Sequence, residues 1–282
     1  MIVSEPSLTN ASWIAGLQEY VKPYWNQLLD GAWAGGIVHG RLTLPQMQGW
    51  MLQMYPFIHA FPKFLAEALI KAEDDYSRAF FISNIRVEKS HAEQWLWMGE
   101  GFGIKREAML ALADGDTPLL RDVQSLNDWL WHVNTKGSLA EAVAATSFAI
   151  EGIASDIARK VPEGFQHYKE HPGVDLCPKT YRWMRQHAQY DDVHPKIALD
   201  IVERYATCER VRQRVMFAAK RSLELLDHAL LTAFRAYSIH TVTNTELKND
   251  LYGQDLPKNQ VQIDLPRSRP RERKRLQSPI AA

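Results

Sequence analysis

Apolar side chains recur at three- and four-residue spacing through most of this chain, from about residue 12 to about residue 237. The stretch WIAGLQEYVKPYWNQLL at 13–29 is typical, and such spacing places apolar residues on one face of a helix. Runs that alternate apolar and polar residues between turn signals, as strands do, are absent from the sequence. The pattern therefore predicts an all-α fold, a single compact bundle of about seven helices.

Local signals predict where several of these helices begin, bend and end. Thr43 is expected to be an N-cap, with Pro45 in the first turn. Pro23, Pro56 and Pro62 fall inside helical patterns, where proline removes a hydrogen bond and predicts a kink or a restart. Further helices are expected at 74–103, 136–160, 178–190 and 195–237.

The last forty or so residues differ in composition from the rest. After residue 239 the chain is polar and without apolar periodicity, so it cannot bury enough apolar area to offset the entropy of ordering. Residues 267–275, RSRPRERKR, hold six Lys/Arg and one Glu, a charge of +5 in a chain whose formal net charge is zero. We expect a folded domain at 1–239 and a disordered, basic, solvated tail at 240–282.

The bulk composition excludes several classes of protein. A net charge of zero gives no reason to expect nucleic acid as a partner, and no apolar stretch is long enough to span a bilayer. Two cysteines without a C-x-x-C pair predict neither a disulfide framework nor a thiolate zinc site. The N-terminus lacks the pattern of a secretion signal. We therefore expect a soluble, cytoplasmic protein.

Two histidines and two aspartates gather in RQHAQYDDVHP, residues 185–195. If this segment is helical, His187, Asp191 and His194 fall at i, i+4 and i+7 and share one face. Tyr190 and Asp192 then point elsewhere. A stripe of imidazole and carboxylate groups is a good set of metal ligands, and Pro195 marks a break after it.

Other helical segments offer partners for this stripe. Glu88 and His91 stand at i, i+3 in NIRVEKSHAEQW, and Glu151 is a lone carboxylate among small and apolar residues in AATSFAIEGIASD. A buried carboxylate is costly unless it is paired with a cation or a metal. Carboxylates with imidazoles suit iron or manganese, and six such ligands suffice for two ions. This set predicts a non-haem di-iron oxidase site.

Each of these residues also has a simpler interpretation. Glu88 taken alone is more typical of a solvated helix residue paired with Lys89 or Arg86, and His91 alone also fits a core histidine bonded to a backbone carbonyl. Glu151 pairs with a basic side chain such as Arg159 in this interpretation. The agreement among three separated segments favours the metal site over these alternatives.

The segments NIRVEKSHAEQW, WLWHVNTKGSLAEAVAATSFAIEG and HAQYDDVHP make the chain resemble the haem-oxygenase-like di-iron oxidases of TenA/PqqC-like fold. Within that family they look most like the bacterial non-haem iron fatty-acid decarboxylases that form medium-chain 1-alkenes such as undecene. The resemblance covers roughly residues 15–235. It implies that the iron ligands are Glu88, His91, Glu151, His187, Asp191 and His194.

The resemblance also implies the reaction. Two Fe(II) ions, the second more labile, would use dioxygen as co-substrate and an external electron donor. The small-molecule substrate, a fatty acid, would lose a hydrogen atom from its β-carbon and then carbon dioxide, while its chain lies in an apolar tunnel. No catalytic residue beyond the metal ligands is assigned, and the residues that bind the substrate stay unassigned. Tyr190 and Asp192 are candidates for orienting His187 or His194.

Three alternatives stay open at this stage. In the first alternative, the same di-iron scaffold acts on an amine or amino acid, by N-oxygenation or carbon–carbon cleavage. Polar residues in the tunnel wall would favour this alternative. The second is the related metal-free helical fold of thiamin-degrading and pyrroloquinoline-quinone-forming enzymes. The third is a non-enzymatic ligand-binding protein with the basic tail as its interaction element. The oligomeric state is also open, with a homodimer among the possibilities.

Overall fold

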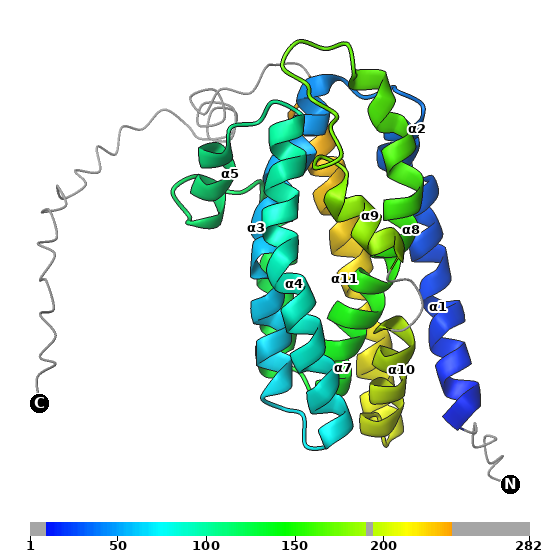
Figure 1. Cartoon of the computed structure of the whole chain (residues 1–282). Coiled ribbons are helices and arrows are strands. Elements are labelled where there is room, and N and C mark those ends of the chain that lie inside the picture. The colour runs from blue at the N-terminus through cyan, green and yellow to red at the C-terminus, as the bar shows by residue number, and fades with distance from the viewer. Residues whose placement is uncertain (1–9, 190–193, 239–282) are drawn as a thin grey trace, which may run out of the picture. The chain divides into compact units, whose positions relative to one another are not determined.

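The computed structural model describes residues 10–189 and 194–238, and within these ranges the chain is helical with no strand (Figure 1). The long helices are α1 (Asn10–Asp30), α3 (Leu44–Leu69), α4 (Asp75–Gly101), α6 (Arg121–Lys136) and α11 (Glu209–Ala236). The shorter ones are α2 (Ala32–Val38), α5 (Arg106–Ala113), α7 (Leu139–Val143), α8 (Glu151–Lys160), α9 (Arg182–Gln189) and α10 (His194–Tyr205). A π-helical segment η1 (Ala144–Ile150) and a 3₁₀ segment η2 (Val161–Tyr168) complete the elements. The predicted all-α class is confirmed.

The predicted number of seven helices is wrong, because the described residues hold eleven α-helices. Short helices such as α2 and α5 account for part of the difference, since a helix of two turns shows too few periods to be separated from its neighbours. The expected helix at 195–237 is also divided into α10 and α11. The predicted tail at 240–282 lies outside the described residues.

Helix α11 lies in the middle of the described domain, with α3 and α4 side by side to one side of it (Figure 1). Helix α3 packs against α4, α6 and α11, and α11 in turn packs against α1 and η1. Helix α9 lies against α4 and α8. The side chains that meet between these helices are buried and mostly apolar, with aromatic residues such as Trp50, Phe64 and Phe81 among the largest. Burial of this apolar area is the main favourable term in folding.

Helix starts are fixed by side-chain caps. Thr43 and Gln46 form a capping box at the start of α3, as the sequence predicted for Thr43. Asp74 caps α4 by accepting a hydrogen bond from the Ser77 amide. Helix α3 continues through both Pro56 and Pro62 rather than restarting at either.

The segment from α7 to α8 is one continuous helical stretch whose middle part, η1, is π-helical. All seven residues of η1 are buried, and the next residue is Glu151. The Ala149 carbonyl accepts a hydrogen bond from Trp25 Nε1 at 3.1 Å, while Thr146 Oγ1 accepts one from Asn134 Nδ2 at 2.7 Å. A π segment shifts the register of the helix that follows, and such segments are common at functional sites. It sets the direction in which Glu151 points.

In the part of the chain that the structure describes, no helix is long and apolar enough to cross a membrane. The expectation of no membrane-spanning segment holds for these residues.

Candidate metal centre

Five of the six predicted ligands line one small pocket. The pocket wall consists of Val87, Glu88, His91, Glu151, Ser155, His187, His194 and Pro195. Helices α4, α8, α9 and α10 therefore converge here. The sixth predicted ligand, Asp191, and the two candidate orienting residues, Tyr190 and Asp192, lie outside the described residues.

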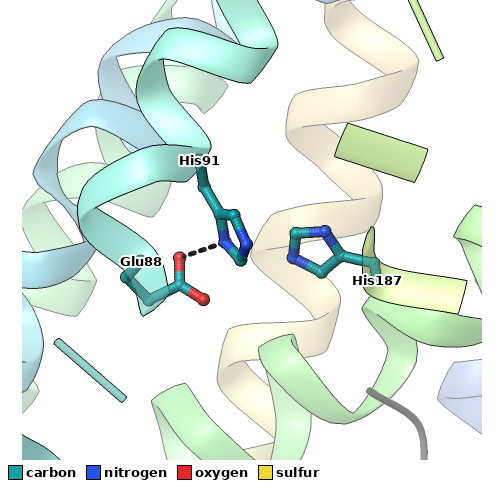
Figure 2. Close-up of side chains that lie close together, drawn as sticks. All are labelled: Glu88, His91 and His187. Atoms are coloured by element: carbon teal, nitrogen blue, oxygen red, sulfur yellow. Dashed lines mark ion pairs between the residues drawn. The ribbon is translucent and has the colours of Figure 1, made fainter. Parts of the chain in front are cut away.

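Glu88, His91 and His187 form the tightest group (Figure 2). Each offers one ligand atom, and these atoms all lie within 4.8 Å of one another. Glu88 and His91 project from the same face of α4, and the imidazole rings of His91 and His187 face each other across the gap from α9. Their ring centroids are 4.2 Å apart. One metal ion can contact all three groups at this spacing.

Burying Glu88, His91 and His187 costs folding free energy unless a cation is bound to them. Glu88 and His91 are only 5% and 2% exposed, which excludes Glu88 as a solvated helix residue. Glu88 Oε2 lies 2.8 Å from His91 Nδ1, yet neither nitrogen of His91 makes a hydrogen bond of good geometry. Buried polar atoms without partners are rare in proteins. These donor atoms therefore fit a metal ion.

His187 is oriented by its own helix. Its Nδ1 lies 3.0 Å from the backbone carbonyl of Trp183, one turn earlier on α9, so Nδ1–H donates there and leaves Nε2 for a metal. The indole of Trp183 stacks on the imidazole with ring centroids 3.7 Å apart. A metal-binding histidine commonly donates its other ring N–H in this way.

Glu151 and His194 form a second group beside the first. His194 Nδ1 lies 2.9 Å from Glu151 Oε1, and the Asn84 side-chain amide donates to both oxygens of Glu151 at 3.1 and 2.9 Å. Asn84 is fully buried. Sequence reasoning missed it, although Asn84, Glu88 and His91 stand at i, i+4 and i+7 on one face of α4. That stripe was a usable signal.

The proton content of the two groups differs. Burial and repulsion from Glu151 raise the pKa of Glu88 well above its ordinary value, while burial lowers the pKa of His91 to about 4. Burial also lowers the pKa of His187, with a smaller contribution from His91. The hydrogen bond to Glu151 raises the pKa of His194. The first two histidines are thus neutral at pH 7, as metal ligands must be.

His187 and His194 lie on the two described helices that border the histidine cluster. His187 is near the end of α9 (Arg182–Gln189), and His194 is the first residue of α10 (His194–Tyr205), with Pro195 in its first turn. Residues 190–193 lie outside the described residues, so the predicted stripe of His187, Asp191 and His194 stays a prediction.

An apolar cavity adjoins the cluster. Its open space measures about 70 Å³. Glu88, Glu151 and His187 line it together with Trp33, Trp50, Met54, Phe57, Ile58, Phe61, Trp95, Ile150, Ile153, Ala154, Ile157, Trp183, Leu226 and Leu230. The three candidate ligands are thus the only titratable groups among these lining residues. Neither cysteine lines the cavity or the metal pocket, so no thiolate is available here.

Comparison with known proteins agrees with this arrangement. Residues 48–227 match the family described as iron-containing redox enzymes, a range that includes all six predicted ligands. The 4-aminobenzoate synthase of Chlamydia trachomatis serovar D is 25% identical over 168 residues, which are 58% of this chain and 68% of that protein.

Solved structures show the same fold. A TenA homologue from Pseudomonas syringae pv. tomato superposes with a TM-score of 0.70 at 22% identity, over 82% of this chain and 98% of that one. A domain with a haem-oxygenase-like fold from Shewanella denitrificans superposes with a TM-score of 0.64 at 16% identity, over 79% and 93% of the two chains. The haem-oxygenase-like fold expected from the sequence is confirmed.

Proposed function

Because the chain belongs to the family of iron-containing redox enzymes, we propose that it is a non-haem iron oxidase that converts a medium-chain fatty acid to a terminal alkene and carbon dioxide. One observation carries the proposal. Buried carboxylate and imidazole groups, without a thiolate, form part of the wall of a cavity that is otherwise apolar. Carboxylate oxygen and imidazole nitrogen are donors that suit non-haem iron.

The residues divide into two candidate iron sites. Glu88, His91 and His187 would hold the first ion, and Glu151 and His194 the second, with Asp191 as a further ligand by sequence resemblance. Bound iron would supply the activation of dioxygen, which no amino-acid side chain provides.

The protein's own groups do three things in this scheme. The Trp183 carbonyl keeps the proton of His187 on Nδ1, so that Nε2 faces the metal. The Asn84 amide holds the Glu151 carboxylate in one orientation by two hydrogen bonds. The apolar cavity wall excludes water and gives a hydrocarbon chain a place beside the metal.

The overall reaction balances only with an electron donor. Removing the β-hydrogen and carbon dioxide from a saturated acid releases two electrons and two protons and leaves the alkene. Reducing dioxygen to two water molecules takes four electrons and four protons. The remaining two electrons must come from a reductant, as the sequence resemblance also implies.

The size of the cavity constrains how the acid enters. An apolar cavity of 150 Å³ holds benzene, and the space here is about half of that. A medium-chain acid therefore needs side chains of the wall to move. Met54, an unbranched and flexible side chain, is suited to this movement.

A second function has support from one comparison. The relative from Chlamydia is a 4-aminobenzoate synthase, which favours an amine or amino acid as substrate on the same scaffold. A fatty acid and an amino acid would each bring a carboxylate, which bound iron would hold, but an amino acid would also bring an ammonium group. Apart from the three candidate ligands, the residues that line the cavity carry no charge to pair with that ammonium group. The cavity wall therefore supports the fatty acid over the amino acid.

The test is direct. The protein is loaded anaerobically with Fe(II), given decanoic, dodecanoic and tetradecanoic acids with a chemical reductant, and exposed to oxygen. We expect headspace analysis to detect alkenes one carbon shorter than the acids. Protein loaded with Zn(II) serves as the control and should form none.

Two other outcomes would contradict the proposal in different ways. Oxygen uptake and oxidation of the iron without alkene, together with turnover of amines or amino acids, would establish the second function. A protein that binds no Fe(II) at all would remove the iron site.

A further inference from the structure

Four of the nine tryptophans of this chain form one connected series. Trp33 contacts Trp50 with ring centroids 5.2 Å apart, Trp50 contacts Trp95 at 5.6 Å, and Trp95 contacts Trp183 at 4.9 Å. The series ends at the candidate metal centre, because Trp183 stacks on His187 with centroids 3.7 Å apart.

The four indoles come from four helices, α2, α3, α4 and α9, and are between 2% and 6% exposed. Each also lines the apolar cavity. Edge-to-face contact accounts for the packing of such rings, but it needs no particular ring type. Tryptophan is the bulkiest choice for a core, and among aromatic side chains it loses an electron readily without losing a proton. A series of four that reaches a candidate iron ligand therefore suggests a redox role.

We propose that these four tryptophans form an electron relay that supplies single electrons to the oxidised iron centre when no substrate occupies the cavity. The inference rests on the proposed function. Electron transfer through protein slows steeply with distance, so several short steps between touching rings are faster than one long step. The relay moves the oxidising equivalent from His187 towards Trp33, away from the ligands.

The electron balance of the relay is simple. Dioxygen would be the oxidant of bound iron. Trp183 would supply one electron to the iron site and become a radical cation, and Trp95 would reduce Trp183 in turn. After two further steps the radical cation would be on Trp33. An external one-electron reductant, such as a reduced flavin or iron–sulfur protein, would return one electron to that indole.

The hydrogen bonding of the indoles fits reversible one-electron chemistry. Nε1 of Trp33 is buried and has no hydrogen-bond partner, and Nε1 of Trp95 donates to the Met51 backbone carbonyl at 2.7 Å. Neither ring has a basic acceptor for its proton. An oxidised ring therefore keeps its proton and returns to the neutral indole by gaining an electron alone.

The relay would protect the protein during failed turnovers. Without a substrate, bound iron would oxidise the side chains nearest to it, and His187 and Trp183 are in contact with each other there. A substrate in the cavity would lie against the same four rings and compete with them as electron source. Excluding side reactions in this way is part of what a protein does for its cofactor.

The experiment uses the full chain loaded with Fe(II), mixed with oxygen in the absence of acid and frozen within milliseconds for electron paramagnetic resonance. Protein with ring-deuterated tryptophan identifies the radical. Trp95→Phe interrupts the relay, and Trp131→Phe removes a tryptophan that packs on Phe64 outside it. Iron content and iron oxidation are measured on each sample.

We expect a narrow tryptophan radical signal in the wild type and in Trp131→Phe, narrowed further by deuteration and reduced by dodecanoic acid. Trp95→Phe should lose the narrow signal, because a radical confined to Trp183 is broadened by the nearby iron. An undiminished signal in Trp95→Phe, an equal loss in Trp131→Phe, or oxidised iron without any tryptophan radical would overturn the relay. Protein that binds no iron, or whose iron oxygen does not oxidise, would overturn the proposed function instead.

Discussion

Glu88 and His91 stand one turn apart on a single uninterrupted helix, and both nitrogens of His91 lack a hydrogen-bond partner. Glu151 and His194 come from two different helices and are already hydrogen-bonded to each other. Asn84 also donates a hydrogen bond to the Glu151 carboxylate. The first group is incomplete without a cation, whereas the second is a neutralised ion pair. We infer that the two sites differ in affinity, and that the ion at Glu88, His91 and His187 binds first.

The difference has a clear physical cause. Metal binding at the first group relieves the cost of burying unpaired polar atoms. A metal must displace a proton at each group, from Glu88 at the first and from His194 at the second. Only at the second group must it also break a hydrogen bond, the one of 2.9 Å between His194 and Glu151. This difference gives a structural reason to expect a more labile second iron.

Glu88→Gln should have the largest effect, because it removes the one carboxylate among the three groups of the first candidate site, which lies in the same pocket as the second. We expect loss of the first iron and of all oxygen-dependent activity, measured by iron analysis and oxygen uptake. Glu170→Gln, at an exposed position outside any helix, is the matched control and should bind iron normally.

The same variant has an opposite effect on the metal-free protein. The pKa of Glu88 is raised in the folded state, so its contribution to stability is present below the ordinary pKa of 4.5 and lost as the pH rises. We expect metal-free Glu88→Gln to unfold at a higher temperature than the metal-free wild type at pH 8. A lower melting temperature would contradict the burial of a carboxyl group at this position.

His194→Ala should separate the two sites. The substitution removes one ligand of the second group and leaves Glu88, His91 and His187 in place. We expect the iron content to fall from two ions to one, with loss of oxygen-dependent activity and an unchanged helical circular dichroism spectrum. His228→Ala, on the exposed face of α11, controls for loss of a histidine. Full activity in His194→Ala would remove the second site.

Asn84→Leu should weaken only the second site. Residues that orient a metal ligand typically contribute about 10–100-fold to affinity, and Asn84 orients Glu151 by two hydrogen bonds. We expect a loss of that size for the second iron, measured by titration with Fe(II) under nitrogen. Asn127→Leu, a buried asparagine on α6, is the control. Equal weakening of both irons would mean that the groups are not independent.

Iron affinity should rise with pH, and we expect this change to be the smallest of the predicted effects. Glu88 and His194 have raised pKa values and hold protons that the metal must displace, so binding strengthens as the pH rises through those values. His91, whose pKa is about 4, is already neutral and contributes no pH dependence above pH 6. Proton release measured during Fe(II) titration checks this. Uptake of protons would contradict the assigned directions.

Much of the fold could be predicted because its signals are local. Helical periodicity indicated the all-α class, and Thr43 marked the start of α3 by its own side chain. Glu88 and His91 were identifiable because their spacing on one helix brings them together in any fold that keeps that helix. The assignment of the six residues as iron ligands stays a prediction, which the substitutions above test.

Other features depend on tertiary contacts that no local pattern reports. The spacing on α4 places Asn84 on the face of Glu88 and His91, but its hydrogen bonds to Glu151 exist only because α8 packs Glu151 against α4. The π-helical segment is an irregularity among small and apolar residues that suit an ordinary helix equally well. The connected tryptophans come from four helices far apart in the sequence, so their series existed only once the helices were packed.

The π-helical segment η1 has a consequence for changes in chain length. It ends one residue before Glu151, and a π-helical turn holds about one residue more than an α-helical turn. Removing a single residue from 144–150 would therefore restore an ordinary helical turn and leave the direction of Glu151 unchanged. Removing a residue from the α-helical part at 139–143 would instead turn Glu151 around the helix axis by about 100°. The position of a deletion, and not only its length, thus decides whether this helix keeps a carboxylate at the metal centre.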